Sequence, residues 1–65
     1  MNIELIANYV YEHLILKFKK ESFTIAISHN TIFILKSENF VIDVLPKIPD
    51  TIKIKEIYIG KVISC

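Results

Sequence analysis

The segment SFTIAISHNTIFILK, residues 22–36, constrains the fold more than any other part of the chain. Two runs of β-branched and aromatic residues flank His29 and Asn30, and such runs are typical of β-strands. Histidine and asparagine are among the few non-glycine residues enriched at positive φ, which a two-residue turn of type I′ requires at both central positions. The segment therefore predicts an antiparallel hairpin that turns at His29 and Asn30, so that His29 is a turn residue rather than the start of an active site.

A two-residue loop also fixes the register of this hairpin. The expected pairs are Ile27 with Ile32, Ile25 with Ile34, and Phe23 with Lys36. One face of the hairpin then carries apolar residues, namely Phe23, Ile25, Ile27, Ile32 and Ile34. The other face is mixed and carries Thr24, Ala26, Ser28, Thr31, Phe33 and Leu35. A slip by one residue would mix the two faces, so this sorting supports the register.

The N-terminal residues 2–12 predict an amphipathic helix whose pattern continues to Phe18. Asn2 is a suitable N-cap, and Glu4 lies in the first turn, where the helix dipole favours a negative charge. One face carries Ile3, Ala7, Val10 and Leu14, with Ile6 and Tyr11 on its flanks. A second stripe of Leu5, Tyr9 and Leu16 lies nearly opposite. Residues 13–19 also alternate with the period of a strand, and of these two interpretations we favour a helix to about residue 18.

The remaining residues predict further strands. In KSENF, a three-residue loop of Ser37, Glu38 and Asn39, with Asn39 left-handed, would start a second hairpin. Phe40, Ile42 and Val44 would then join the apolar face, and Asp43 would lie on the other face beside Phe33. Pro46 and Pro49 interrupt the sheet, because proline cannot donate to a strand ladder. The segment TIKIKEIYIG predicts one long strand with a bulge near Lys55 and Glu56, the alternative being a tight turn between two strands.

These elements together predict one small α+β domain over residues 1–65, in which an N-terminal helix packs on an antiparallel β-meander of four to five strands. On the helix, the residues expected to be buried are Ile3, Ile6, Val10 and Leu14. On the sheet, their expected contacts are Phe23, Ile25, Ile27, Ile32, Ile34 and Ile42.

The chain has more apolar residues than a domain of this size can bury. A domain of about 60 residues buries only about 60% of the surface that its unfolded chain exposes. This chain has 65 residues, is 52% hydrophobic, and has Cys65 as its single cysteine, which excludes an internal disulfide. Small chains without such a cross-link usually gain stability by oligomerisation or by binding metal. We therefore expect a homo-oligomer, a dimer or higher, and a protein partner.

Two surfaces are candidates for a protein interface. The second sheet face would carry Ala26, Phe33, Leu35, Val41 and Leu45 among polar residues, and an apolar centre with a polar rim is typical of a modest interface. The second stripe of the helix adds Leu5, Tyr9 and Leu16. From this pattern we expect a small non-catalytic protein-binding module that occludes a partner through a sheet face or an edge strand.

Catalytic, metal and cofactor chemistry finds little support in the sequence. His13, His29 and Cys65 are widely spaced, and the single glycine excludes a glycine-rich phosphate loop. We expect no enzyme activity, no catalytic or metal-binding residues and no cofactor. Net charge is +1, and no uncharged apolar stretch reaches the roughly 18 residues that a membrane span needs. We therefore expect no membrane association and a cytoplasmic location.

Nucleic-acid binding is the alternative function. Lys53, Lys55 and Lys61 are expected on the solvent side of the last segment, with Tyr58 close by, and basic residues beside a stacking aromatic residue suit single strands. The competing interpretation is an edge strand protected by lysine. All eight basic residues are lysine, which disfavours sequence-specific DNA recognition because arginine is the usual guanine contact.

A helix followed by four or five antiparallel strands in about 65 residues resembles the Sm-like small barrels in outline, and this resemblance implies a nucleic-acid-binding function without assigning any residue. The small size and the composition, rich in isoleucine and lysine, also resemble phage accessory proteins, many of which bind and block a host protein. That second resemblance implies an inhibitor or adaptor.

Overall fold

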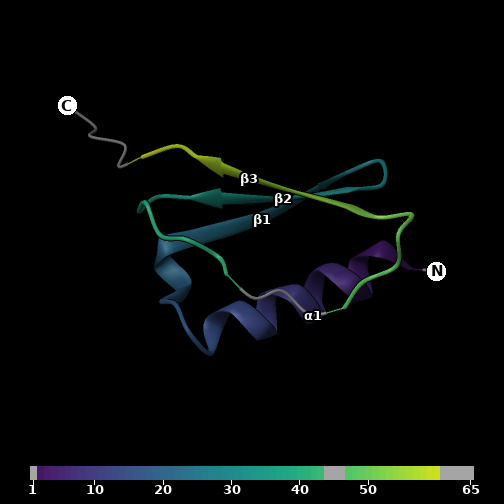
Figure 1. Ribbon diagram of the computed structural model, residues 1–65, viewed down its shortest axis with the longest axis horizontal. Coiled ribbons are helices and arrows are strands. Elements are labelled where there is room, and N and C mark those ends of the chain that lie inside the picture. The colour runs from purple at the N-terminus through teal and green to yellow at the C-terminus, as the bar shows by residue number, and fades with distance from the viewer. Residues whose placement is uncertain (1, 44–46, 61–65) are drawn as a thin grey trace.

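The computed structural model describes residues 2–43 and 47–60 (Figure 1). The elements are α1 (Ile3–Ile15), a short 3-10 helix η1 (Lys20–Ser22), β1 (Phe23–Ser28), β2 (Thr31–Lys36) and β3 (Lys53–Tyr58). The three strands form one sheet in the order β1-β2-β3, with α1 on one side of it. The fold is therefore α+β, as the sequence predicts.

Helix α1 begins and ends for local reasons. Asn2 is its N-cap, as predicted, and its Oδ1 atom accepts a hydrogen bond of 2.9 Å from the backbone N–H of Glu4. The helix ends at Ile15, so the prediction of a helix to residue 18 was wrong by three residues. The chain instead turns at Leu16 and Lys17 and enters η1 before β1. The alternative of a strand over residues 13–19 is also excluded.

Strands β1 and β2 form the predicted hairpin in the predicted register. The structure pairs Ile27 with Ile32, Ile25 with Ile34, and Phe23 with Lys36. His29 has a φ of 56° and Asn30 has a negative φ. Only the first turn residue is thus left-handed, which is the φ pattern of a type II′ turn and corrects the expectation of positive φ at both positions. Asn30 Nδ2 donates to the carbonyl oxygen of Thr51 at 3.0 Å, which ties the turn to the segment before β3.

The second hairpin, predicted at Ser37–Asn39, does not form within the described residues. Asn39 has a negative φ, and the described residues between β2 and β3 form no strand. Phe40 stacks on Phe18, with ring centroids 4.2 Å apart, so a contact with the end of the helical region holds the chain on the α1 side of the sheet. Asp43 pairs with Lys17 at 3.3 Å instead of lying beside Phe33. Val44, which we expected on the apolar face, lies outside the described residues.

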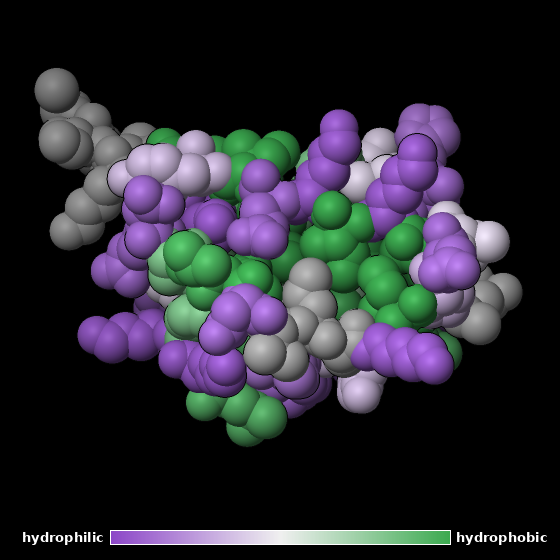
Figure 2. Space-filling view, viewed as in Figure 1, coloured by the Kyte–Doolittle hydropathy of each residue, from purple (hydrophilic) through white to green (hydrophobic). Residues whose placement is uncertain are grey.

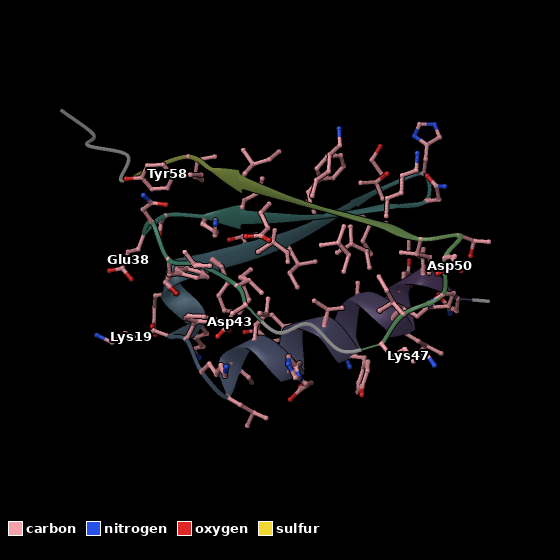
Figure 3. The ribbon with its side chains drawn as sticks, in the orientation of Figure 1. Lys19, Glu38, Asp43, Lys47, Asp50 and Tyr58 are labelled. Atoms are coloured by element: carbon pink, nitrogen blue, oxygen red, sulfur yellow. The ribbon has the colours of Figure 1, made fainter. Side chains whose placement is uncertain are left out.

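The connection from β2 to β3 is a crossover, and its described parts run alongside α1 (Figure 1). Ile48 packs against both clusters of the core, which holds the second half of this connection against the helix. Asp43, Lys47 and Asp50 mark its course in Figure 3. A crossover of this kind brings the chain back to the end of the sheet from which β2 started, and so allows the next strand to be parallel.

Strand β3 is parallel to β2, which corrects the prediction of an antiparallel meander of four to five strands. The described residues form a three-stranded mixed sheet with two free edges, and therefore an open sheet rather than a small barrel. The pairing runs without interruption from Thr31 with Lys53 to Lys36 with Tyr58. The predicted bulge near Lys55 and Glu56 is therefore absent, as is the alternative tight turn between two strands.

The core lies between α1 and the sheet. Its buried hydrophobic residues are Ala7, Val10, Leu14, Phe23, Ile32, Ile34 and Ile52. Ile3, Ile6, Ile25 and Ile42 are partly buried and pack against them, as predicted. Ile27 was also expected in the core, but 40% of its surface is exposed. It faces the α1 side at the free edge of β1, where only one neighbouring strand covers it.

Candidate functional site

The sheet has one face that no other described element covers. Because side chains alternate along a strand, the positions between the buried residues point away from α1. These positions form the open face: Thr24, Ala26, Ser28, Thr31, Phe33, Leu35, Lys53, Lys55 and Ile57.

Apolar side chains occupy the centre of the open face. The strand register sets Ala26, Phe33 and Lys55 side by side in one row. The next row contains Thr24, Leu35 and Ile57. Phe33 and Leu35 are partly buried by their neighbours, and Ile57 is 39% exposed. Hydrophobic surface is visible at the top of Figure 2, where the sheet lies, with polar side chains around it.

The charge on the open face is positive. Lys53 and Lys55 lie along β3 at its margin, and both are exposed. The described strand positions of this face include no carboxylate. Thr24, Ser28 and Thr31 complete a polar rim on the other side. The open face therefore combines an apolar centre with a basic margin, a pattern that suits either a protein with acidic groups or a nucleic acid.

The residues predicted as a protein interface fall on two separate surfaces. Phe33 and Leu35 lie on the open face, as expected. Val41 is 79% exposed but belongs to the crossover instead of the sheet. Leu45 lies outside the described residues.

The helical stripe is the second surface. Leu5 and Tyr9 are 68% and 58% exposed on the outer side of α1, and Leu16, the C-cap residue that extends this stripe, is 83% exposed. They do not belong to the buried face of the helix, which contacts the sheet. The open face and the helical stripe therefore cannot act as a single flat contact.

The residues predicted for nucleic-acid binding are also divided. Lys53 and Lys55 share the open face, whereas Tyr58 points to the α1 side and lies near the end of β3 in Figure 3. Lys61 lies outside the described residues. The aromatic residue that the fold places beside Lys55 is Phe33, its direct partner in the parallel ladder.

Two features of β3 were missed by reasoning from sequence. Ile57 belongs to the open face, and Glu56 faces α1, where its carboxylate lies 3.1 Å from Lys36 Nζ. If side chains had been assumed to alternate between the two faces without interruption from Lys53 onward, both placements would have been predicted. We expected a bulge instead, because apolar residues normally take the inner face. The buried Lys36 supplies the partner that lets an acidic residue occupy that face.

Other candidate sites are small. Lys19, Glu21, Ser22, Ser37 and Glu38 line a hollow of about 180 Å³. A second hollow, of about 260 Å³, lies beside the hairpin turn at His29 and Asn30. Small-molecule sites usually measure about 300–1,000 Å³. In the described part of the chain, no three His, Cys, Asp or Glu side chains gather closely enough to hold a metal ion.

No family model, no curated protein and no solved structure matches this chain. Among the described residues, no helix has the length and apolar character needed to cross a bilayer. Function is therefore inferred from the physical properties of the surfaces.

Proposed function

We propose that the protein is a small non-catalytic protein-binding module whose open face covers, and thereby occludes, a surface on a partner protein. The arrangement of the two central rows supports this proposal. Phe33, Leu35 and Ile57 are adjacent across β2 and β3, and α1 covers only the other side of the sheet. An apolar cluster held on a sheet presents a fixed shape, so little conformational freedom is lost when a partner binds.

The charge of the open face indicates the chemistry of that partner. Lys53 and Lys55 border the apolar centre, and the described strand positions of the face supply no carboxylate to pair with them. Two copies meeting face to face would bring lysines together without counter-charges. A partner with an apolar patch bordered by aspartate or glutamate would complement the face and exclude basic competitors.

The size of the open face sets the strength of such a contact. Strands lie about 4.8 Å apart and rise about 3.3 Å per residue. A sheet of three six-residue strands is therefore roughly 14 by 20 Å, or about 280 Å² in projection. A stable interface buries about 800 Å² on each partner. A single copy therefore binds weakly and reversibly, unless the face is enlarged.

The test is a pull-down from nuclease-treated lysate of the source cells with three tagged forms of the full chain. Wild type is compared with Ile57→Lys on the open face and with Leu16→Lys on the outer side of α1. We expect one protein to be retained at a fixed ratio by wild type and by Leu16→Lys, and to be lost with Ile57→Lys. The proposal would be overturned if the Ile57→Lys form still captured the partner protein, or if only the Leu16→Lys form failed to capture it.

The position of Phe33 beside Lys55 supports a second candidate function, the binding of single-stranded nucleic acid on the same face. Bases stack on exposed aromatic rings, and lysines neutralise the phosphates. Ile57→Lys distinguishes the two functions, because an added positive charge strengthens phosphate binding while it disrupts an apolar protein contact. Fluorescence anisotropy with single-stranded oligothymidine would show affinity that falls steeply with salt. Affinity that is independent of salt, or absent, excludes this second function.

A further inference from the structure

Strand β1 forms a sheet edge that the described residues leave unprotected. The strand order places β1 and β3 at the two edges of the sheet. Proteins usually block such edges with charged side chains, proline or bulges. Strand β3 contains Lys53, Lys55 and Glu56, whereas β1, with the sequence FTIAIS, has no charge, no proline and no glycine. Its pairing with β2 is continuous, so no bulge turns the edge away.

The outward backbone groups of β1 can be identified. The carbonyl oxygen of Ser22 accepts a hydrogen bond of 2.8 Å from the N–H of Ser37, so the residues that exchange backbone bonds with β2 alternate from position 22. The N–H and C=O groups of Phe23, Ile25 and Ile27 therefore point away from the sheet. Among the described residues, no backbone hydrogen bond outside the strand ladder involves β1.

Apolar side chains accompany this edge. Ile27 is 40% exposed although it faces the α1 side. Tyr11 of α1 packs against Phe23 with ring centroids 5.4 Å apart, so this flank of the helix lies over β1. Ile15, one turn further along the same flank, is 36% exposed. A strand added to β1 would cover Ile27 and approach this flank of the helix.

We propose that β1 pairs antiparallel with β1 of a second copy, around a two-fold axis through Ile25, and so forms a continuous six-stranded sheet. In this register Ile25 opposes its own copy, and Phe23 opposes Ile27 of the second copy. The outward N–H and C=O groups of Phe23, Ile25 and Ile27 then form backbone hydrogen bonds with the second copy. If the axis passed through Ala26 instead, Phe23 would oppose the turn residue His29 of the second copy, and the outward N–H and C=O groups of Phe23 would stay unpaired.

The side chains of β1 are self-complementary in this register. Each strand pair is uncharged: Ile25 with Ile25, Phe23 with Ile27, and Thr24 with Ala26. An aromatic residue opposite a β-branched residue is a favourable cross-strand pair. Strand β3 lacks this property, because its two central two-fold registers would oppose Lys55 to Lys55 or Glu56 to Glu56. The occupant that fits the edge of β1 is therefore a second copy of this chain.

This inference is independent of the proposed function, because the edge of β1 and the open face are different surfaces. Pairing through β1 places both α1 helices on one side of the enlarged sheet and both open faces on the other. The enlarged sheet would then present two apolar centres on the same side, with the two β1 strands between them. A partner that reaches both halves would bind more tightly than one copy allows.

Sedimentation equilibrium of the full chain, from micromolar to millimolar concentration, tests the inference. Ile27→Lys places a charge at the edge of β1. Ile57→Lys is the matched control, since Ile57 has nearly the same exposure, 39% against 40%, but lies on β3. We expect a wild-type dimer, a dimer of unchanged affinity for Ile57→Lys, and affinity at least about tenfold weaker for Ile27→Lys. Circular dichroism checks that each variant is folded.

A second variant covers the case in which Ile27→Lys does not fold. Ile27→Pro removes an outward N–H and leaves the ladder with β2 intact, which is where an edge strand tolerates proline. It should also weaken the dimer. A wild-type chain that is monomeric throughout, a dimer that neither Ile27 variant weakens, or one that Ile57→Lys weakens equally would overturn the inference. If Ile57→Lys abolished capture of the partner protein while the dimer persisted, the result would support the role of the open face and leave the β1 dimer unchallenged.

Discussion

The ammonium group of Lys36 lies 3.1 Å from Glu56 Oε1 on the side of the sheet that faces α1. Lys36 also donates to the carbonyl oxygen of Phe40 at 2.9 Å, and only 7% of its surface is exposed. This lysine therefore connects β2 both to β3 and to the start of the crossover. Its ion pair with Glu56 stabilises the parallel strand at an inward position that has no apolar side chain.

We predict that Lys36→Met lowers the free energy of unfolding by about 1–2 kcal/mol, because it removes two hydrogen bonds while keeping the apolar stem. Glu56 is 36% exposed and regains water, so the loss stays below the roughly 3–5 kcal/mol of a fully buried pair. Urea denaturation measures the change. Lys17→Met is the control, since the side chains of Lys17 and Asp43 are 51% and 68% exposed. A control that costs as much as Lys36→Met would contradict the assigned role.

The helix offers a matched test of which stripe faces the core. Leu14 is 1% exposed and Leu16 is 83% exposed. Leu14→Ala should cost about 2–5 kcal/mol through lost packing and the cavity left behind. Domains below about 70–80 residues rarely exceed 3–5 kcal/mol in stability, so this variant should be largely unfolded. Leu16→Ala should change stability by less than about 0.5 kcal/mol. Thermal melts followed by circular dichroism would refute the placement of α1 if both variants behaved alike.

His29 is predicted to act through its backbone conformation. Its φ of 56° is unfavourable for a β-branched residue and acceptable for glycine. His29→Val should therefore destabilise the protein by about 1–2 kcal/mol. His29→Gly should change stability by less than about 1 kcal/mol, because relief at the turn offsets the greater freedom of the unfolded chain. Chemical denaturation measures the free energy of unfolding of the two variants. If both lost the same amount, the imidazole itself would be what stabilises the fold.

The parts of the fold that follow from neighbouring residues could be predicted. The hairpin register is confirmed pair by pair, because the strand period and a two-residue turn leave only one arrangement that keeps its faces sorted. The N-cap at Asn2 is confirmed for the same reason, since it depends on residues within one helical turn. On the candidate site, Phe33 and Leu35 lie on the second face of the sheet, as predicted. Lys53 and Lys55 were predicted on the solvent side of the last segment, and the structure adds that this side is the same face.

The errors concern contacts between distant residues. Phe40 and Ile42 alternate like a strand, but the stacking of Phe40 on Phe18 holds that segment against the helical region. The pattern of residues 52–59 suggested a bulge, because the inward position of Glu56 makes sense only once Lys36 is known to lie beside it. A parallel partner for β2 likewise requires the crossover, whose course depends on Ile48 reaching the core. None of these contacts is encoded in local periodicity.

The measurement that tests the central claim most directly is site-specific photocrosslinking in lysate of the source cells. A benzophenone amino acid is placed at Ile57 on the open face and, separately, at Leu16 on the outer side of α1. If the open face binds a partner protein, the probe at Ile57 gives one discrete adduct that survives nuclease, and the probe at Leu16 gives none. An adduct from Leu16 alone, or no protein adduct from Ile57, would contradict the claim that the open face is the binding surface.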